Sequence, residues 1–206
     1  MIKIAITGNI SSGKSTVSKI FETFGFPVFN SDLASREAEK DPEILSKFLD
    51  IVGHDIMVDG EINRTIMRER IFNDTAMLQK VNELMTPYVS KQFQKFVKEH
   101  KNKKAVIMES AIIFEGYHQN KFDMVITVVA DKDTRIKRTM TRDGLSLDLV
   151  LAKMKNQLSD DFKAKNSDFI IINEDMPNCD FMMLLLKQVE PIIDIIKDSS
   201  KFNKNS

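Results

Sequence analysis

Short apolar runs alternate with longer stretches of mixed polarity along most of the chain. The five runs occupy residues 1–7, 26–32, 103–110, 123–130 and 168–173. Runs of this length that are rich in Ile, Val and Phe are typical of β-strands. The run DMVITVVA is almost entirely apolar, which favours a strand that is covered on both faces.

The stretches between these runs show helical periodicity. Val17, Ile20, Phe21 and Phe24 are spaced as one face of a helix that begins near Lys14, and the glycine that follows is a common helix end. Further helices are predicted over residues 41–53, 131–165 and 181–196. Strands and helices therefore alternate along the chain.

Residues 61–100 contain no strand-like run. Apolar residues recur there at helical spacing, a second helix is expected to open near Asn73, and Pro87 is expected to interrupt or kink it. We predict a helical lobe, over residues 41–102, inserted between two strands of the sheet.

The alternation of strands and helices predicts an α/β fold with a doubly wound parallel sheet. In such sheets ligands bind beyond the carboxyl ends of the strands. The polar residues expected at those ends are Gly8, Asp32, Glu109 and Asn173. A length of 206 residues fits one domain with an inserted lobe.

Composition excludes several partners. Lys plus Arg equals Asp plus Glu at 30 each, so no overall charge attracts nucleic acid or a membrane surface. No stretch approaches the roughly 20 apolar residues of a membrane helix. The one cysteine, Cys179, cannot form an internal disulfide, which favours a reducing compartment. We therefore expect a cytoplasmic protein, a monomer or weak homo-oligomer, with a polar, frayed tail over residues 198–206.

One motif carries most of the chemistry. Residues 8–15, GNISSGKS, match G-x-x-x-x-G-K-[ST] between a predicted strand and a predicted helix. Backbone N–H groups of such a loop surround phosphate oxygens, the lysine adds a positive charge, and the serine hydroxyl can hold Mg²⁺. The predicted ATP site comprises Gly8, Ser11, Ser12, Gly13, Lys14, Ser15 and Thr16, with Ser15 as the magnesium ligand.

A GTPase switch is the alternative from another class. Residues 50–53, DIVG, and residues 120–123, NKFD, match its D-x-x-G and N-K-x-D motifs. The first lies inside a predicted helix and the second precedes a strand instead of following one. Both positions disfavour a switch.

A small-molecule kinase explains more residues. Asp32 ends the second predicted strand and can serve as a base for an acceptor hydroxyl, although it can also cap a helix. Arg138 and Arg142 can close on the transferred phosphoryl group, or form a solvated helix face. Glu109 or Glu115 can orient Mg²⁺ through water, or be ordinary loop carboxylates.

Several segments together resemble the dephospho-CoA kinase family. They are TGNISSGKSTVSKIFETFGFPVFNSDLASRE, INRTIMRERIFND, RIKRTMTRDGLS and NQLSDDFKAKNSDFIIIN, in this order, over residues 2–173. The resemblance implies a P-loop kinase that transfers the ATP γ-phosphate to the ribose 3′-hydroxyl of dephospho-CoA. It also implies a five-stranded nucleotide core over residues 1–40, 103–130 and 166–197, with a lid over residues 131–165.

The resemblance also assigns roles to single residues. Asp32 resembles the family's base, Arg36 a substrate-site residue, and Asn173 the polar residue near the adenine. Arg138 and Arg142 resemble lid arginines that act with Lys14 on the transferred group. The helical lobe resembles the part that receives dephospho-CoA, whose phosphates Arg64 or Arg68 can meet.

Three departures from the family pattern concern the acceptor side. The chain has Asn30 where the family usually has the first aspartate of Asp-x-Asp, and Thr86 where a histidine often precedes proline. The segment AIIFE replaces Pro-Leu-Leu-x-Glu, so that only Glu115 remains. The residues alone also permit another small-molecule kinase, for a nucleoside monophosphate or a sugar.

Overall fold

The computed structural model describes residues 1–116, 118–174 and 180–198. The predicted parallel sheet is confirmed, with five strands in the order β2-β5-β1-β6-β7. The strands are β1 (Ile2–Thr7), β2 (Val28–Asn30), β5 (Ala105–Glu109), β6 (Met124–Val129) and β7 (Phe169–Ile172). Cys179 and the predicted tail beyond residue 198 lie outside the described residues.

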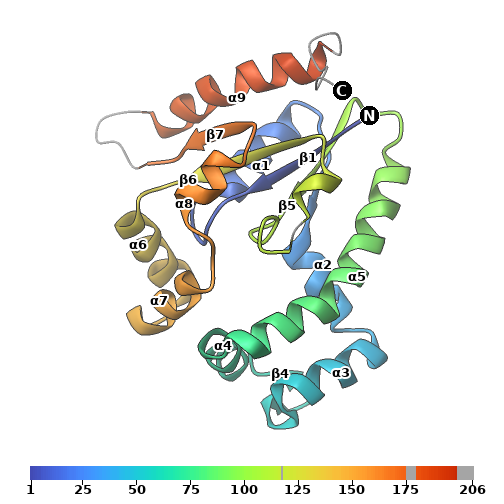
Figure 1. Ribbon diagram of the computed structural model, residues 1–206, viewed down its shortest axis with the longest axis vertical. Coiled ribbons are helices and arrows are strands. Elements are labelled where there is room, and N and C mark those ends of the chain that lie inside the picture. The colour runs from blue at the N-terminus through green and yellow to red at the C-terminus, as the bar shows by residue number, and fades with distance from the viewer. Residues whose placement is uncertain (117, 175–179, 199–206) are drawn as a thin grey trace.

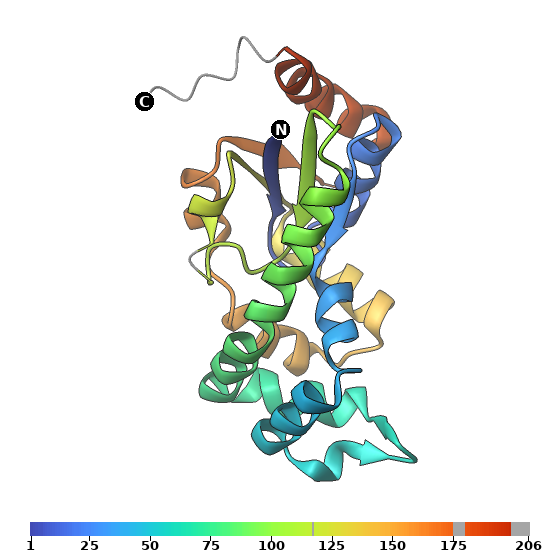
Figure 2. The ribbon, with the colours of Figure 1, turned by 90° about the vertical axis from the view of Figure 1, so that its right-hand side faces the viewer.

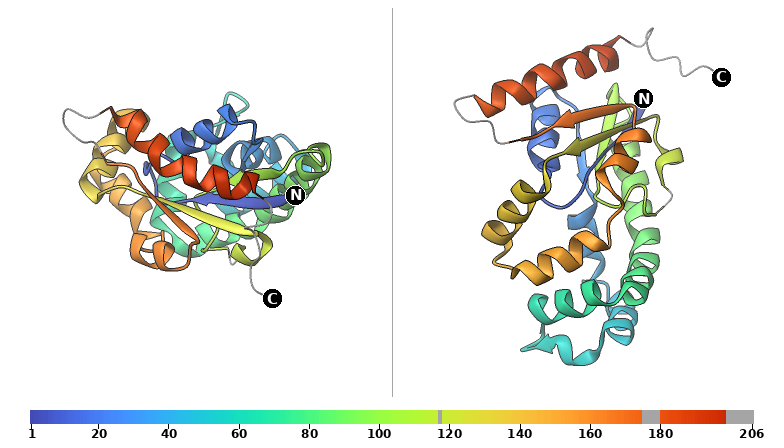
Figure 3. Two further views of the ribbon diagram at one scale, coloured as in Figure 1. Left: turned by 90° about the horizontal axis from the view of Figure 1, so that it is seen from above. Right: turned by 60° about the vertical axis from the view of Figure 1, so that its left-hand side comes forward.

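Two helices cover one face of the sheet (Figures 1 and 3). They are α1 (Lys14–Thr23) and α9 (Phe181–Lys197), and their apolar residues form one buried cluster with inward-facing strand residues. Ile4 and Ile6 of β1 point into this cluster, whereas Ala5 between them belongs to the opposite face. This alternation is the period-two pattern of a strand with both faces buried.

A long helix links the other face of the sheet to the helical lobe. α5 (Thr75–Glu99) places Phe93 in the cluster beneath the sheet and Met85 in a separate cluster of the lobe. Figure 2 shows it running from the level of the sheet to the lobe. The helix continues through Pro87, so Pro87 does not interrupt it, and the alternative that Pro87 kinks it stays a prediction.

The lobe contains a short hairpin as well as helices. Its other helices are α2 (Ser31–Ala38), which leads into it from the core, α3 (Pro42–Val52), η1 (His54–Ile56) and α4 (Arg64–Asn73). The strands β3 (Met57–Val58) and β4 (Glu61–Ile62) pair antiparallel around Asp59 and Gly60, both with positive φ. The prediction that no strand begins at Glu61 was therefore wrong. An Asp-Gly pair is the usual signal for such a turn.

The predicted lid is divided into three helices. α6 (Lys132–Asp143) and α7 (Leu147–Lys155) lie beside the cavity, and α8 (Asp160–Lys165) returns to the sheet. A further short helix, η2 (Gln119–Lys121), precedes β6. None of the helices in the described part of the chain has the length and apolar composition of a membrane span.

Candidate active site

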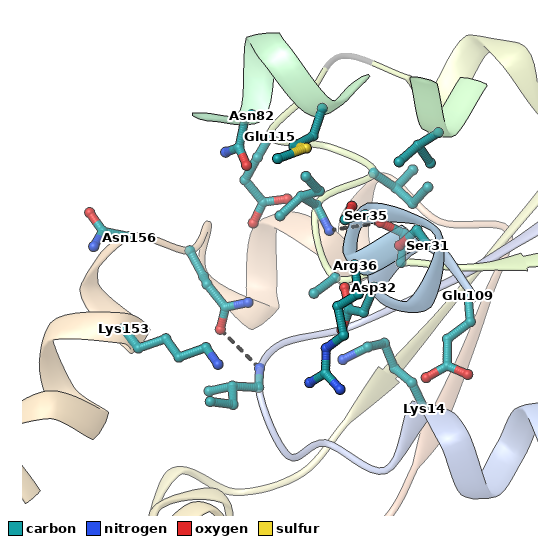
Figure 4. A pocket seen from close by; sticks show the side chains of 18 of the residues that line it. Lys14, Ser31, Asp32, Ser35, Arg36, Asn82, Glu109, Glu115, Lys153 and Asn156 are labelled. Carbon is teal, nitrogen blue, oxygen red and sulfur yellow. Dashed lines mark hydrogen bonds between the residues drawn. The ribbon is translucent and has the colours of Figure 1, made fainter. Parts of the chain in front are cut away.

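A cavity of about 860 Å³ opens where the sheet, the helical lobe and the lid meet. Its lining combines Lys14 and Asp32 from the core, Arg68 from α4, and Arg138 and Lys153 from the lid. These residues are far apart in the sequence, and the carboxyl ends of parallel strands bring the core residues together. Figure 4 shows several of them extending into the same space.

The phosphate loop, residues 8–16, depends on its glycines for steric reasons. A Cβ on Gly8 would lie 2.2 Å from the Val128 carbonyl oxygen, and one on Gly13 would lie 1.7 Å from Nδ2 of Asn173. Both glycines also have positive φ, as does Ser11 at 55°. The loop thus turns tightly against β6 and β7, with α1 beginning directly after Gly13.

The Lys14 side chain lies over the loop. Its Nζ donates to the carbonyl oxygens of Gly8 at 3.0 Å and Asn9 at 3.2 Å. Burial lowers the pKa of Lys14 to about 8, while the negative charges of Asp32 and Glu109 oppose that shift. An ammonium group deprived of water in this way binds phosphate oxygens more strongly than an exposed one.

Asp32 is a cavity residue and does not cap the helix that follows β2. The cap is Asn30, whose Oδ1 accepts a hydrogen bond from the Leu33 N–H at 3.0 Å. Asp32 lies in the first turn of α2 with its side chain exposed to the cavity. Asn30 therefore has a structural role, because asparagine caps a helix as well as aspartate does.

The structure separates the two candidate magnesium carboxylates. Burial raises the pKa of Glu109, and the ammonium of Lys14 is the largest influence that opposes it. Glu115 forms an ion pair with the fully buried Lys163, at 2.7 Å, and accepts a hydrogen bond from the Leu158 N–H at 3.1 Å. Glu109 is therefore the carboxylate beside the phosphate loop. Glu115, in the segment that follows β5, is instead bound to Lys163 of α8.

The two lid arginines have different surroundings. Nη1 of Arg138 donates to the carbonyl oxygens of Ser11, at 3.5 Å, and Asn173, at 3.2 Å. Arg142 forms two hydrogen bonds with the carboxylate of Asp143, at 2.8 and 2.9 Å. Both arginines line the cavity. Arg138 thus lies against the phosphate loop, whereas Arg142 is held at the end of α6.

Asn173 supports the phosphate loop from behind. The residue is buried at the end of β7, and its Nδ2 donates to the Ser12 carbonyl oxygen at 2.6 Å. Thr139 of α6 makes a second contact, donating to Oγ of Ser11 at 2.8 Å. Side chains from a strand end and from the lid therefore fix the same loop. The structure leaves the predicted place of Asn173 near an adenine as a prediction.

The three arginines predicted to bind the acceptor, Arg36, Arg64 and Arg68, differ in whether they form an ion pair with a described carboxylate. Arg64 donates to Glu39 at 3.0 Å, which ties α4 to the end of α2. Arg36 and Arg68 also line the cavity, and neither pairs with a carboxylate among the residues that the structure describes. Arg68 is therefore better placed than Arg64 to meet an anionic acceptor. Thr86 borders the same space.

Gln157 and Lys153 are among the cavity residues that were missed from the sequence. Gln157 accepts a hydrogen bond from the Ile10 N–H at 2.9 Å, so the segment after α7 contacts the phosphate loop directly. Lys153 of α7 extends toward the side of the cavity that holds Arg36 (Figure 4). Both residues lie in a polar stretch whose pattern resembles a solvated helix, and only the tertiary contacts distinguish them.

Comparisons with known proteins agree with this geometry. The family model for dephospho-CoA kinase matches residues 2–178. A dephospho-CoA kinase of Bacteroides fragilis is 34% identical over 175 residues, covering 84% of this chain and 85% of the relative. One of Leptospira interrogans is 38% identical over 172 residues, covering 82% and 83%. The solved dephospho-CoA kinase of Campylobacter jejuni shares 26% identity with a TM-score of 0.63, covering 96% of this chain and 98% of that one.

Proposed function

The chain belongs to the dephospho-CoA kinase family, and we propose that its central cavity holds ATP and dephospho-CoA for phosphoryl transfer to the ribose 3′-hydroxyl. The observation that carries this proposal is the position of Asp32. It borders the cavity beside Lys14 of the phosphate loop, and its negative charge acts on that lysine. The proposed nucleotide site and the proposed base therefore border the same cavity.

The acceptor hydroxyl needs a base and a fixed position. We assign the base to Asp32, which is exposed to the cavity and is not used as a helix cap. Its carboxylate accepts the proton as the hydroxyl oxygen attacks the γ-phosphorus of ATP and ADP leaves. Arg36, one turn further along α2, lies on the same side of the cavity and can hold the acceptor.

Cations stabilise the charge that spreads over the transferred phosphoryl group. Lys14 belongs to the phosphate loop itself. We propose that Arg138 and Arg142 supply further positive charge from the lid. The contact of Arg138 with the Ser11 carbonyl supports this assignment, because it holds the guanidinium group at the phosphate loop. Lid and loop together then exclude water from the reacting atoms.

The residues beside Lys14 fit a magnesium ion. Ser15 offers a hydroxyl and Glu109 offers carboxylate oxygens, and Mg²⁺ prefers oxygen ligands of this kind. When bound, the ion neutralises part of the negative charge on the phosphate oxygens. Glu115 takes no part in this set because it is paired with Lys163.

A comparison of acceptors tests the proposed function. ADP release would be measured with ATP and, in turn, dephospho-CoA, its 3′-deoxy analogue, AMP, dCMP and gluconate. We expect rapid turnover with dephospho-CoA and none above background with the 3′-deoxy analogue. Higher kcat/KM with AMP, dCMP or gluconate than with dephospho-CoA would contradict the proposal and favour another small-molecule kinase.

A further inference from the structure

We propose that Lys153 of the lid and Arg68 of the helical lobe together bind the diphosphate of the acceptor. This inference rests on the proposed function, because dephospho-CoA carries a diphosphate diester attached to the ribose that is phosphorylated. Lys153 lies on α7 and Arg68 on α4, and both line the cavity. One ligand group would thus contact two separate parts of the fold.

The contacts of α7 place Lys153 at the junction of lid and lobe. Its Nζ lies 4.8 Å from the ring centre of Phe72, at the end of α4. Nearby, Nδ2 of Asn156 donates to the Phe72 carbonyl oxygen at 2.8 Å, and Thr75 donates to Asn156 Oδ1 at 3.0 Å. Figure 4 shows the Lys153 side chain extending from this junction into the cavity.

The charges around this junction leave two cations without a carboxylate. Asp143 is paired with Arg142 through two hydrogen bonds. Neither Arg68 nor Lys153 forms an ion pair within the described part of the chain. A diphosphate diester carries two negative charges at neutral pH, which matches two unpaired cations.

Desolvation makes an anion at this place favourable. Burial lowers the pKa of Lys153, and the charges of Asp143 and Asp32 only partly oppose this effect. A cation without an ionic partner in partly dry surroundings is costly, and an anionic ligand offsets that cost. The Phe72 ring adds a favourable contact for an ammonium group but supplies no negative charge.

The position favours the acceptor over ATP. The charges of Asp143, Asp32, Arg68 and Arg142 all act on the pKa of Lys153. Lys153 lies against the lobe, because its Nζ contacts the Phe72 ring at the end of α4 and the neighbouring Asn156 donates to the Phe72 carbonyl oxygen. Arg64, the other arginine expected on the acceptor side, is already paired with Glu39. Arg68 lies on α4, the helix that Lys153 contacts through Phe72, and has no ion pair within the described part of the chain, so these two cations are placed to share one anionic group.

Steady-state kinetics of Lys153→Met test the proposal against Lys155→Met, a matched change on the same helix. Lys155 is exposed and does not line the cavity. We expect Lys153→Met to raise the KM for dephospho-CoA by about 10- to 100-fold, as for the loss of a charged hydrogen bond, with the KM for ATP unchanged. Lys153→Arg should stay within about threefold of wild type, because its charge is retained. Arg68→Met should raise the same KM.

The outcomes separate this inference from the proposed function. Absence of wild-type turnover with dephospho-CoA contradicts the proposed function itself. Normal wild-type turnover with equal KM values in Lys153→Met and Lys155→Met overturns the role of Lys153 alone. The role of Lys153 is also overturned if Lys153→Arg raises the KM for dephospho-CoA as much as Lys153→Met does. A positive charge at this position would then not be what binds the acceptor. An increase in the KM for ATP alone would place Lys153 on the nucleotide side.

Discussion

At the scale of single residues, Lys14 has the most informative environment. Its ammonium group is shielded by the protein, contacts two carbonyl oxygens of the phosphate loop, and is close to the charges of Asp32 and Glu109. Burial is the larger effect, so the pKa falls to about 8. The charge state of Lys14, the proposed triphosphate ligand, therefore changes just above neutral pH.

This pKa gives a prediction for ATP affinity. A triphosphate favours the ammonium form of Lys14, so binding raises its pKa and takes up a proton. The Kd for ATP should be constant below about pH 8 and rise above it, by up to about tenfold per pH unit. Calorimetric titrations on both sides of that pH measure this change.

Lys14→Arg is the matched control, because arginine stays charged throughout the range. Its Kd for ATP should show no rise above about pH 8. A wild-type profile as flat as that of the arginine variant would show that deprotonation of Lys14 does not weaken binding.

At the scale of elements, the segment between α7 and α8 fastens the lid to the phosphate loop. Gln157 accepts from the Ile10 N–H, and Asn9 Nδ2 donates both to the Leu158 carbonyl oxygen and to Asp160, each at 3.0 Å. Asp160 is in turn paired with Arg135 of α6 at 2.7 Å. The first half of the loop is thus positioned by side chains from the lid.

Gln157→Ala tests this connection. The variant leaves the Ile10 N–H without its side-chain partner, and we expect the KM for ATP to rise by about 2- to 10-fold, as for one lost hydrogen bond. Gln79→Ala is the control, since Gln79 is exposed and its side chain donates to Glu83 of the same helix. Equal KM values for ATP in the two variants would contradict a positioning role for Gln157.

The elements themselves were largely predictable because their signals are local. Apolar runs located the five strands, and the glycine-lysine motif located the turn into α1. The β3–β4 hairpin was missed although Asp59-Gly60 carried its signal, because a two-residue strand leaves almost no periodicity. Predicted strand ends also extended past the true ones: the second run was predicted to reach Asp32, but β2 ends at Asn30, which caps the helix that follows.

At the scale of the whole molecule, the helical lobe is joined to the core in two ways. α5 contributes to the cluster beneath the sheet and to that of the lobe. The Arg64–Glu39 ion pair adds a second connection between α4 and α2, the helix that carries Asp32. The proposed acceptor residues and Asp32, the proposed base, therefore lie on parts of the fold that are connected to each other.

The composition of the cavity could be predicted only in part. The phosphate loop and Asp32 lie at strand ends, where the parallel sheet directs ligands. The partners of charged residues depend on contacts across the whole chain, such as Ile10 with Gln157 or Glu115 with Lys163. The family resemblance suggested Arg64 or Arg68 as an acceptor residue, but the pairing of Arg64 with Glu39 follows from the tertiary fold.

The most direct test of the account is the turnover of Asp32→Asn at saturating ATP and dephospho-CoA, with the Kd for ATP measured alongside. Asparagine keeps the size of the side chain but cannot accept the hydroxyl proton. We predict that kcat falls by about 10²- to 10⁴-fold while the Kd for ATP changes by less than about threefold. Wild-type kcat in this variant would contradict the assignment of Asp32 as the base.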